Sequence, residues 1–141
     1  MAVSIENQSG ASAKIPALRK LAEYVLRAER ADANSEVSVA LVDNEVMRDL
    51  NRRFRSLDEP TDVLAFELGS EGELSGEVVI APAVALEQAQ EAQIPVTDEI
   101  EELLVHGLLH LLGYGHEGGA DAEKMFARQA ELRRDFAGEG A

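Results

Sequence analysis

Hydrophobic and polar residues alternate over several short stretches of the chain, with the period of two that is typical of a half-buried β-strand. In the first stretch, Val3 and Ile5 alternate with polar neighbours, as expected for a strand at the edge of a sheet. The second stretch ends at Asp43 and Asn44, either of which can cap a following helix. We predict strands over residues 3–7, 37–42, 63–66 and 77–80.

Between and after these strands, apolar residues recur every three to four positions, which indicates amphipathic helices. Within residues 45–54, this spacing places Val46, Leu50 and Phe54 on one face and turns the arginines largely elsewhere. Thr97 can cap a helix that runs to Leu112 and stops before Gly113. We predict helices over residues 15–30, 45–54, 82–93, 97–112 and 121–136.

The order of these elements shows no regular alternation of strand and helix, so it favours an α+β fold over a doubly wound sheet. A chain of 141 residues has the size of one globular domain. We expect a single domain over residues 1–137. Residues 138–141, where two glycines flank a glutamate, are expected to form a disordered tail.

The composition excludes several classes of protein. Cysteine is absent, which excludes disulfide scaffolds, Cys-ligated zinc and thiol nucleophiles, so any metal must be held by His, Asp or Glu. The 13 Lys and Arg residues stand against 27 Asp and Glu residues, and this net charge of −14 disfavours nucleic-acid binding through a broadly basic surface. Residues 1–10 do not read as a signal peptide, and no apolar run is long enough to span a membrane, so we expect a cytoplasmic protein.

The three histidines of the chain, His106, His110 and His116, lie within eleven residues of one another. Residues i and i+4 share a face of a helix, so the imidazoles of His106 and His110 can converge on one ion. Gly113 lets the backbone leave the helix, so that His116 can supply a third ligand. Three neutral imidazoles leave one tetrahedral position open, as in a catalytic zinc site. The spacing therefore predicts a metal site at the end of a helix.

The same spacing, His-x-x-x-His-x-x-Gly-x-x-His, is that of the metzincin peptidases, with one difference. In those enzymes the residue after the first histidine is the glutamate that acts as general base, and here it is Gly107. A zinc metallopeptidase-like hydrolase therefore stays open as an alternative, although it would lack its usual proton acceptor.

Residues 106–116 also resemble the signature of the YbeY family, the metal-dependent endoribonucleases that are called rRNA maturation factors. The family pattern is His-Gly-x-x-His-Leu-x-Gly-Tyr-Asp-His, and the chain departs from it at Gly115, where the family has Asp. Ala65 is a second departure, at a position where the family has Ser. Further family motifs are matched in the same order by residues 50–51, 54–55, 60–66 and 76–80.

This resemblance implies a small mixed sheet of about four strands packed with about five helices, with one zinc ion at the end of a cleft. Nickel is an alternative metal, because imidazole suits both. The implied activity is single-strand-specific cleavage of RNA in rRNA maturation, at the 3′ end of 16S rRNA, and in ribosome quality control. The implied partners are rRNA and the ribosome or a ribosomal protein, with no DNA substrate and no membrane.

An RNA substrate would need a region of local positive charge on this acidic chain. Residues 48–55 hold four arginines against one aspartate, and we expect Arg48, Arg52 and Arg55 to bind substrate. The match to a family motif makes Arg55 a catalytic candidate, since its guanidinium can hold a phosphate with two hydrogen bonds or stabilise the charge of the transition state. Glu102 shares a helix edge with the first two histidines and is a second candidate, as a base or as a hydrogen-bond acceptor for a ligand.

A third function stays open beside the ribonuclease and the peptidase. In a non-catalytic, ribosome-associated RNA-binding module, the metal would only fix the C-terminal helices. Gly115 makes this alternative less remote, because an Asp at that position could orient a histidine or a water molecule.

Overall fold

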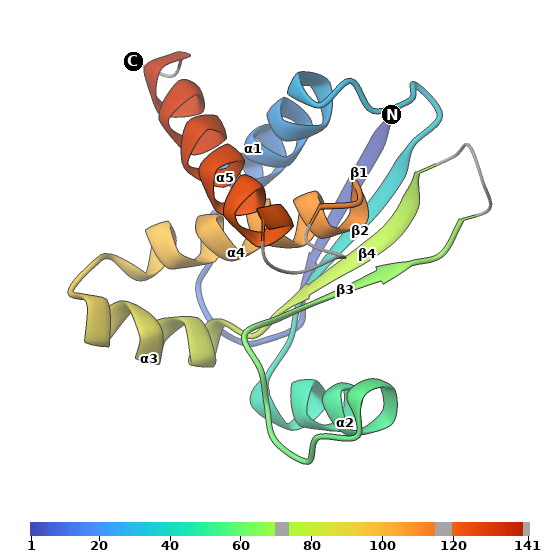
Figure 1. Ribbon diagram of the computed structural model, residues 1–141. Coiled ribbons are helices and arrows are strands. Elements are labelled where there is room, and N and C mark those ends of the chain that lie inside the picture. Colours follow the sequence, from blue (N-terminus) through green and yellow to red (C-terminus); the bar gives the residue numbers. More distant parts are fainter. Residues whose placement is uncertain (70–73, 115–119, 140–141) are drawn as a thin grey trace.

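The computed structural model describes residues 1–69, 74–114 and 120–139 of the chain (Figure 1). Over these residues, four strands and five helices follow one another in the predicted order. The strands are β1 (Ala2–Asn7), β2 (Glu36–Leu41), β3 (Val63–Glu67) and β4 (Ser75–Ile80). The helices are α1 (Ile15–Ala28), α2 (Asn44–Arg55), α3 (Pro82–Ala92), α4 (Val96–Leu111) and α5 (Ala120–Glu139).

The strands form one mixed sheet in the order β1-β2-β4-β3. β1, β2 and β4 run parallel to one another, whereas β3 pairs antiparallel with β4. β1 is an edge strand, as its alternating sequence predicts, and β3 is the other edge. This mixed sheet with its helices confirms the α+β class.

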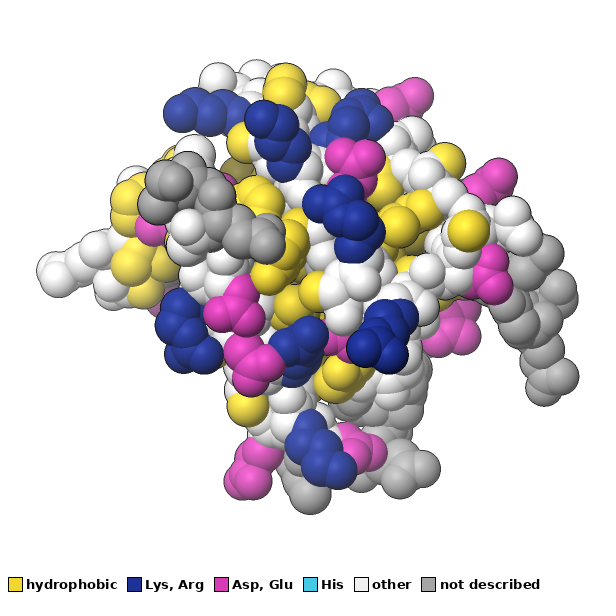
Figure 2. All heavy atoms as spheres, turned by 90° about the horizontal axis from the view of Figure 1, so that it is seen from above, with side chains coloured by type: hydrophobic (Ala, Val, Ile, Leu, Met, Phe, Trp, Pro, Cys, Tyr) yellow, Lys and Arg dark blue, Asp and Glu magenta, His cyan; other side chains and the backbone are white. Residues whose placement is uncertain are grey.

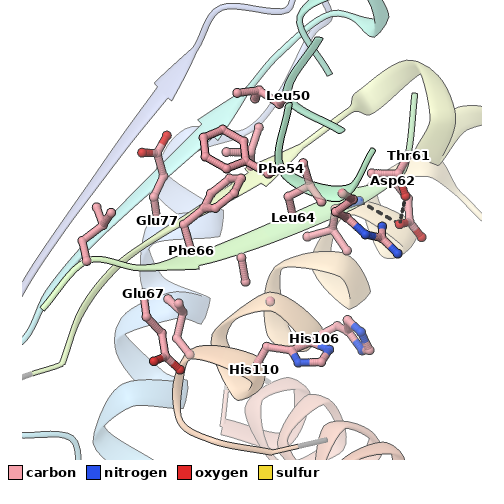
Figure 3. A pocket seen from close by; sticks show the side chains of 17 residues that line it. Leu50, Phe54, Thr61, Asp62, Leu64, Phe66, Glu67, Glu77, His106 and His110 are labelled. Carbon is pink, nitrogen blue, oxygen red and sulfur yellow. Dashed lines mark hydrogen bonds between the residues drawn. The ribbon is translucent and has the colours of Figure 1, made fainter. Parts of the chain in front are cut away.

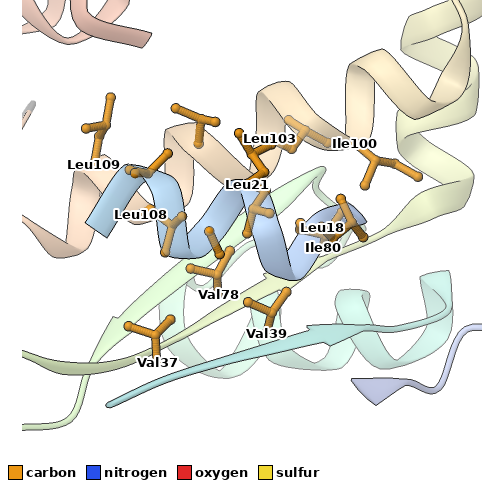
Figure 4. Close-up of a cluster of buried hydrophobic side chains, with 14 of the residues drawn as sticks. Leu18, Leu21, Val37, Val39, Val78, Ile80, Ile100, Leu103, Leu108 and Leu109 are labelled. Carbon is orange, nitrogen blue, oxygen red and sulfur yellow. The ribbon is translucent and has the colours of Figure 1, made fainter. Parts of the chain in front are cut away.

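One face of the sheet is covered by α1 and α4, and α5 lies outside them as an additional layer (Figure 1). The main core lies between these two helices and the sheet (Figure 4). Side chains alternate between the two faces of a sheet, so every second residue of a strand points toward α1 and α4. In this core, these strand residues pack against the apolar faces of the two helices. The buried side chains include Leu18, Leu21, Val37, Val39, Val78, Ile80, Ile100, Leu103, Leu108 and Leu109.

The opposite face of the sheet is covered in part by α2. A smaller core on this face joins Met47 of α2 to Val42, Leu64, Val79 and Ala81. α2 begins after Asp43, whose carboxylate accepts a hydrogen bond from the backbone N–H of Val46 at 2.9 Å. Asp43, rather than Asn44, is therefore the cap of this helix.

Most helix ends lie one to three residues from the predicted ones, as at the start of α4 and the end of α5. α4 begins at Val96, because the carbonyl of Pro95 already accepts from the backbone N–H of Asp98 at 3.1 Å, so Thr97 lies inside the helix rather than capping it. α5 continues to Glu139, two residues into the segment that the sequence predicts to be disordered. Phe136 supports this end, since its ring centroid lies 5.3 Å from that of Tyr24 on α1. Over the described residues, no helix is both long and apolar enough to cross a membrane.

Candidate active-site cleft

A cleft of about 1070 Å³ runs along β3, with α2 on one side and α4 on the other (Figure 3). Leu50 and Phe54 of α2 lie over Leu64 and Phe66 of β3 and make one wall apolar. The opposite wall belongs to α4 and carries two imidazoles. Polar side chains along the cleft are Arg55, Thr61, Asp62, Glu67 and Glu77.

The two imidazoles are those of His106 and His110, which lie one turn apart on the same face of α4. Their ring centroids are 4.7 Å apart and their planes are inclined by 76°. Both side chains are partly exposed to the cleft, so the pair can present nitrogen atoms to one ion, as the i and i+4 spacing predicts. Within residues 1–69, 74–114 and 120–139, no group of three His, Asp or Glu side chains is placed to hold a metal. The predicted third ligand, His116, lies outside the described residues, as does Gly115.

The chain leaves α4 directly after the histidines, through the turn that Gly113 makes possible. Gly113 has a φ of 101°, a left-handed conformation that suits glycine. The backbone N–H of Gly113 donates to the carbonyl of His110 at 3.0 Å, and that of Tyr114 donates to Leu109 at 3.0 Å. These are the two hydrogen bonds of a Schellman motif. The helix therefore ends one residue before the predicted Leu112, with the predicted glycine as its stop signal.

Tyr114 belongs to the supporting structure and not to the cleft. Its hydroxyl donates to Oε2 of Glu29 at 2.9 Å, and Arg128 of α5 donates to the same carboxylate. Burial raises the pKa of Tyr114, and the hydrogen bond to Glu29 raises it further. The contact joins the end of α4 to α1 and α5.

His106 has a second set of contacts, which leads from the cleft to α5. Its Nδ1 lies 3.2 Å from Oε1 of Gln129, and Nε2 of Gln129 donates to Oε2 of Glu102. Nη1 of Arg133 donates to the other oxygen of Glu102 at 2.7 Å. Glu102 thus faces α5 and does not line the cleft, so its position does not suit the role of a base. It reaches the histidine only through Gln129, a residue that the sequence analysis did not select.

Acidic side chains lie near the end of the cleft that is nearest α3, and of these Asp62 lines the cleft. Asp62 accepts from the backbone N–H of Val63 at 2.7 Å and from Nε2 of Gln88 at 3.2 Å. Burial raises the pKa of Glu99 on α4, and the negative charges of Glu102 and Asp62 raise it further. The carboxylate of Asp62 makes this end of the cleft unfavourable for a phosphate.

Two of the three arginines predicted to bind substrate are engaged with carboxylates. Nε and Nη2 of Arg48 donate to the two oxygens of Asp58 at 2.8 and 3.0 Å, and these hydrogen bonds lower the pKa of Asp58. Arg52 donates to Asp49 at 2.6 Å, and Arg53 lies 3.4 Å from the same carboxylate. Neither Arg48 nor Arg52 lines the cleft.

Arg55 differs from these neighbours. It lines the cleft, and it makes no ion pair or hydrogen bond with any residue that the structure describes. Among the described residues, Arg55 is the one Lys or Arg side chain that lines the cleft.

The face of the molecule seen from above in Figure 2 shows basic and acidic side chains interspersed, and no histidine is visible on it.

Gly107 lies where a metzincin would carry its general base. A Cβ atom on Gly107 would be 2.6 Å from Cγ1 of Val78 and 3.4 Å from Cγ2 of Val63. Both valines belong to the sheet, so α4 packs closely against β3 and β4 at Gly107. A glutamate has no room there, which removes the structural basis for a metzincin-like base at this position.

The apolar wall is a feature that the sequence analysis did not assign to the site. The rings of Phe54 and Phe66 meet edge to face, with their centroids 4.9 Å apart. Phe54 is nevertheless 62% exposed. The i, i+4 spacing of Val46, Leu50 and Phe54 is the signal for this face, and it is equally compatible with a face in the core.

Known proteins that are similar to this chain cover nearly its whole length. The sequence model of the family described as Endoribonuclease YbeY matches residues 4–137. A Thermobifida fusca protein named Endoribonuclease YbeY is 42% identical over an alignment of 142 positions, which covers 94% of this chain and 92% of that protein. A Salinispora tropica protein of the same name is 39% identical and covers 94% of each chain. A Thermotoga maritima protein solved in solution has a TM-score of 0.71 at 32% identity, covering 97% of this chain and 90% of that one.

Proposed function

The chain belongs to the YbeY endoribonuclease family, and from this premise we propose that it is a metal-dependent endoribonuclease that cleaves single-stranded RNA. The observation that carries the proposal is the cleft itself. It combines a histidine pair on α4, one arginine that has no partner among the described residues, and an exposed aromatic wall. We extend the proposal to rRNA maturation at the 3′ end of 16S rRNA and to ribosome quality control.

The proposed ligands of the metal are His106, His110 and His116, with one zinc or nickel ion per chain. The chemistry of the first two fits, because two neutral imidazoles one helical turn apart are common ligands of these metals. Such an ion supplies the Lewis acidity that hydrolysis of a phosphodiester needs.

Arg55 is the proposed phosphate-binding and catalytic residue. Its guanidinium is not paired with any carboxylate in the described part of the chain, so it can donate two hydrogen bonds to one phosphate group. The same donors stabilise the additional negative charge of the phosphorus centre in the transition state. Arg48 and Arg52 would first have to leave Asp58 and Asp49, so their contribution to binding is smaller than the sequence predicts.

The apolar wall supports the preference for single strands. Unpaired bases stack on aromatic side chains, whereas bases in an RNA duplex are already stacked and lie inside a groove that side chains read poorly. Phe54 offers an exposed ring next to Arg55, so one nucleotide could place its base on the ring and its phosphate on the guanidinium.

Metal content is the first test. We would measure zinc and nickel per chain by elemental analysis in protein purified without added metal, together with His110→Ala. We expect about one ion per chain in the native protein and a loss in the variant. Little metal in both would contradict the proposed site.

Cleavage assays then test the activity. A labelled single-stranded RNA and its duplex are incubated with the metal-loaded protein, Arg55→Ala and the control Arg53→Ala. Arg53 lies on the same helix but is paired with Asp49 and does not line the cleft. We expect cleavage of the single strand only, a rate reduced about 100-fold or more in Arg55→Ala with unchanged metal content, and a nearly native rate in the control.

Each alternative function gives a different result. Cleavage of an unfolded protein by the metal-loaded chain would favour the peptidase. Normal metal binding and RNA binding without any cleavage would favour the non-catalytic module. A native rate in Arg55→Ala would contradict the role of Arg55. The cytoplasmic location and the ribosomal partner stay predictions, which sedimentation of the protein with ribosomes from a cell extract would test.

A further inference from the structure

A series of hydrogen bonds leads from His106 to α5. Which group donates and which accepts in each of them follows from the residues at the far end of the series. We call the connected side chains of Gln129, Glu102 and Arg133 the Gln129 relay. Arg133 can only donate, and the ionised carboxylate of Glu102 can only accept. The group of Gln129 that faces Glu102 is therefore its NH₂ group, as the hydrogen bond from Nε2 requires.

This direction determines what His106 meets. With the NH₂ group of Gln129 turned to Glu102, the carbonyl oxygen Oε1 is the atom 3.2 Å from Nδ1 of His106. A carbonyl oxygen can only accept, so Nδ1 must carry the proton. In a neutral imidazole, Nε2 is then the nitrogen with the free lone pair.

We propose that Gln129 is a positioning residue that holds His106 in the Nδ1-protonated tautomer and so keeps Nε2 ready to bind a metal ion. This inference rests on the proposed function, in which His106 is a metal ligand. A metal-bound histidine usually gives its second N–H to a carboxylate, a backbone carbonyl or water. Here an amide stands between the histidine and the carboxylate, and it transmits the direction of the hydrogen bond without placing a negative charge on the ring.

The relay is well placed for this role. Gln129 is only 8% exposed, so both ends of its amide need protein partners, and both partners are on α4. Arg133 is anchored at three points of α4, since it also donates to Oε1 of Glu101 at 3.0 Å and to the carbonyl of Asp98 at 3.2 Å. A flip of the Gln129 amide would bring NH₂ against Nδ1–H and a carbonyl against a carboxylate.

The experiment reads the tautomer directly and does not depend on RNA. ¹⁵N NMR shifts of both ring nitrogens of His106 are recorded on the metal-free full chain at about pH 8, where an ordinary imidazole is neutral. Zinc affinity is measured on the same samples by competition with a chelator. The variants are Gln129→Leu, Glu102→Gln and the exchange Glu102→Gln/Gln129→Glu. Glu101→Gln is the matched control, because Glu101 also pairs with Arg133 but does not contact Gln129.

We expect the native protein and the Glu101→Gln control to carry the proton of His106 on Nδ1. Gln129→Leu removes the acceptor, and Glu102→Gln removes the group that sets the direction, so both should show a mixture of tautomers. Zinc affinity should fall by about 10- to 100-fold in Gln129→Leu. The exchange should restore the tautomer and the affinity, because a carboxylate at 129 accepts from Nδ1 and an amide at 102 donates to it.

A native protein with the proton of His106 on Nε2 would overturn the proposal. So would an unchanged tautomer and affinity in both Gln129→Leu and Glu102→Gln. Where Gln129→Leu fails to fold by circular dichroism, the comparison of Glu102→Gln with the exchange decides. If His106 shows the expected tautomers but the protein does not cleave RNA, only the proposed function is refuted. If the protein cleaves RNA but the variants do not change the tautomer of His106, only the role of the relay is refuted.

Discussion

Two of the four phenylalanines are largely exposed, Phe54 at 62% and Phe126 at 61%, and both lie beside the proposed site. Phe54 belongs to the apolar wall of the cleft, and the ring centroid of Phe126 lies 6.1 Å from that of His106. Exposed large apolar side chains that gather around a site indicate a binding surface. A flat apolar group such as a base can therefore stack on these exposed rings beside the site.

Replacing Phe54 by alanine should weaken the binding of single-stranded RNA by about 1–3 kcal/mol, the usual loss when one stacked base loses its aromatic partner. Fluorescence anisotropy with a labelled oligonucleotide and metal-free protein measures this loss without cleavage. Phe54→Trp should retain the affinity, and Leu86→Ala, which removes an exposed apolar side chain from α3, should not change it. An unaltered affinity in Phe54→Ala would rule out stacking on this ring.

The raised pKa of Glu99 predicts a pH dependence of stability. Because burial and neighbouring carboxylates favour its protonated form in the folded state, the folded protein keeps this proton to a higher pH than the unfolded chain. The contribution of Glu99 to stability therefore falls as the pH rises from the pKa of Glu99 in the unfolded chain to its pKa in the folded protein. At higher pH the contribution stays low. Glu99→Gln should be more stable than the native protein at pH 7, and the difference should vanish below about pH 4. Urea unfolding of both proteins across this pH range measures the difference in stability. A difference that does not change with pH would contradict the prediction.

At the scale of elements, the site depends on how closely α4 approaches the sheet. Gly107 and Gly76 each lie where a Cβ atom would come within 3 Å of a packed neighbour, Val78 for the first and Leu111 for the second. The helix that carries the histidines thus fits against the strands that form the floor of the cleft. This close packing restricts how far the imidazoles can move relative to β3.

Gly107→Ala should therefore destabilise the protein by about 1–3 kcal/mol, although alanine favours helix over glycine. The added methyl group meets Val78, a buried branched side chain of β4, so the helix itself has to shift. Gly138→Ala on α5 is the control, since a Cβ there has no neighbour within 4 Å. Urea unfolding should show a loss in the first variant and none in the second; equal stabilities would mean that α4 packs less closely than described.

The order of the elements, and their bounds to within one to three residues, could be predicted from the sequence. Each element has a local signal, such as its hydrophobic period, a capping residue or a glycine that ends a helix. α2 shows the limit of such signals. Met47 and Asn51 share the spacing of Leu50 and Phe54, and the pattern alone does not reveal that the pair containing a polar residue is the buried one. Asn51 is buried because its side-chain amide donates to the carbonyl of Glu59 at 2.8 Å, a contact with a loop eight residues away.

The site could be predicted only where its residues are near one another in the chain. The pairing of His106 with His110 follows from one helical turn, and the structure shows it. The contacts of Glu102 with Gln129 and Arg133 join positions 27 and 31 residues apart, and no periodicity reports on them. The exclusion of Arg48 from the cleft likewise depends on Asp58, which lies beyond the end of α2.

At the scale of the whole molecule, a net charge of −14 surrounds a cleft in which Arg55 is the one Lys or Arg side chain among the described lining residues. Long-range attraction cannot bring RNA to such a surface, so the affinity must come from contacts inside the cleft. A ribosomal partner that holds the RNA would compensate for this repulsion, in line with the proposed function.

The salt dependence of RNA binding should accordingly be weak. Each phosphate neutralised on a single strand contributes about −0.7 to the slope of log K against log salt, so one or two contacts give a slope of about −0.7 to −1.4. Anisotropy titrations at several KCl concentrations measure this slope, and Arg55→Ala should reduce its magnitude by about 0.7, the contribution of one phosphate contact. A much steeper slope would point to a basic surface beyond the cleft.

The outer position of α5 has a consequence for the synthesis of the protein. Gln129 and Arg133 are translated after every strand and after the helix that carries His106 and His110. In a growing chain, the residues of the sheet, α1 and α4 are present while His106 still lacks its partner. The orientation of this histidine is therefore completed last, when α5 docks, so an unfinished chain on its own ribosome does not yet have the assembled site with which it would act on ribosomal RNA.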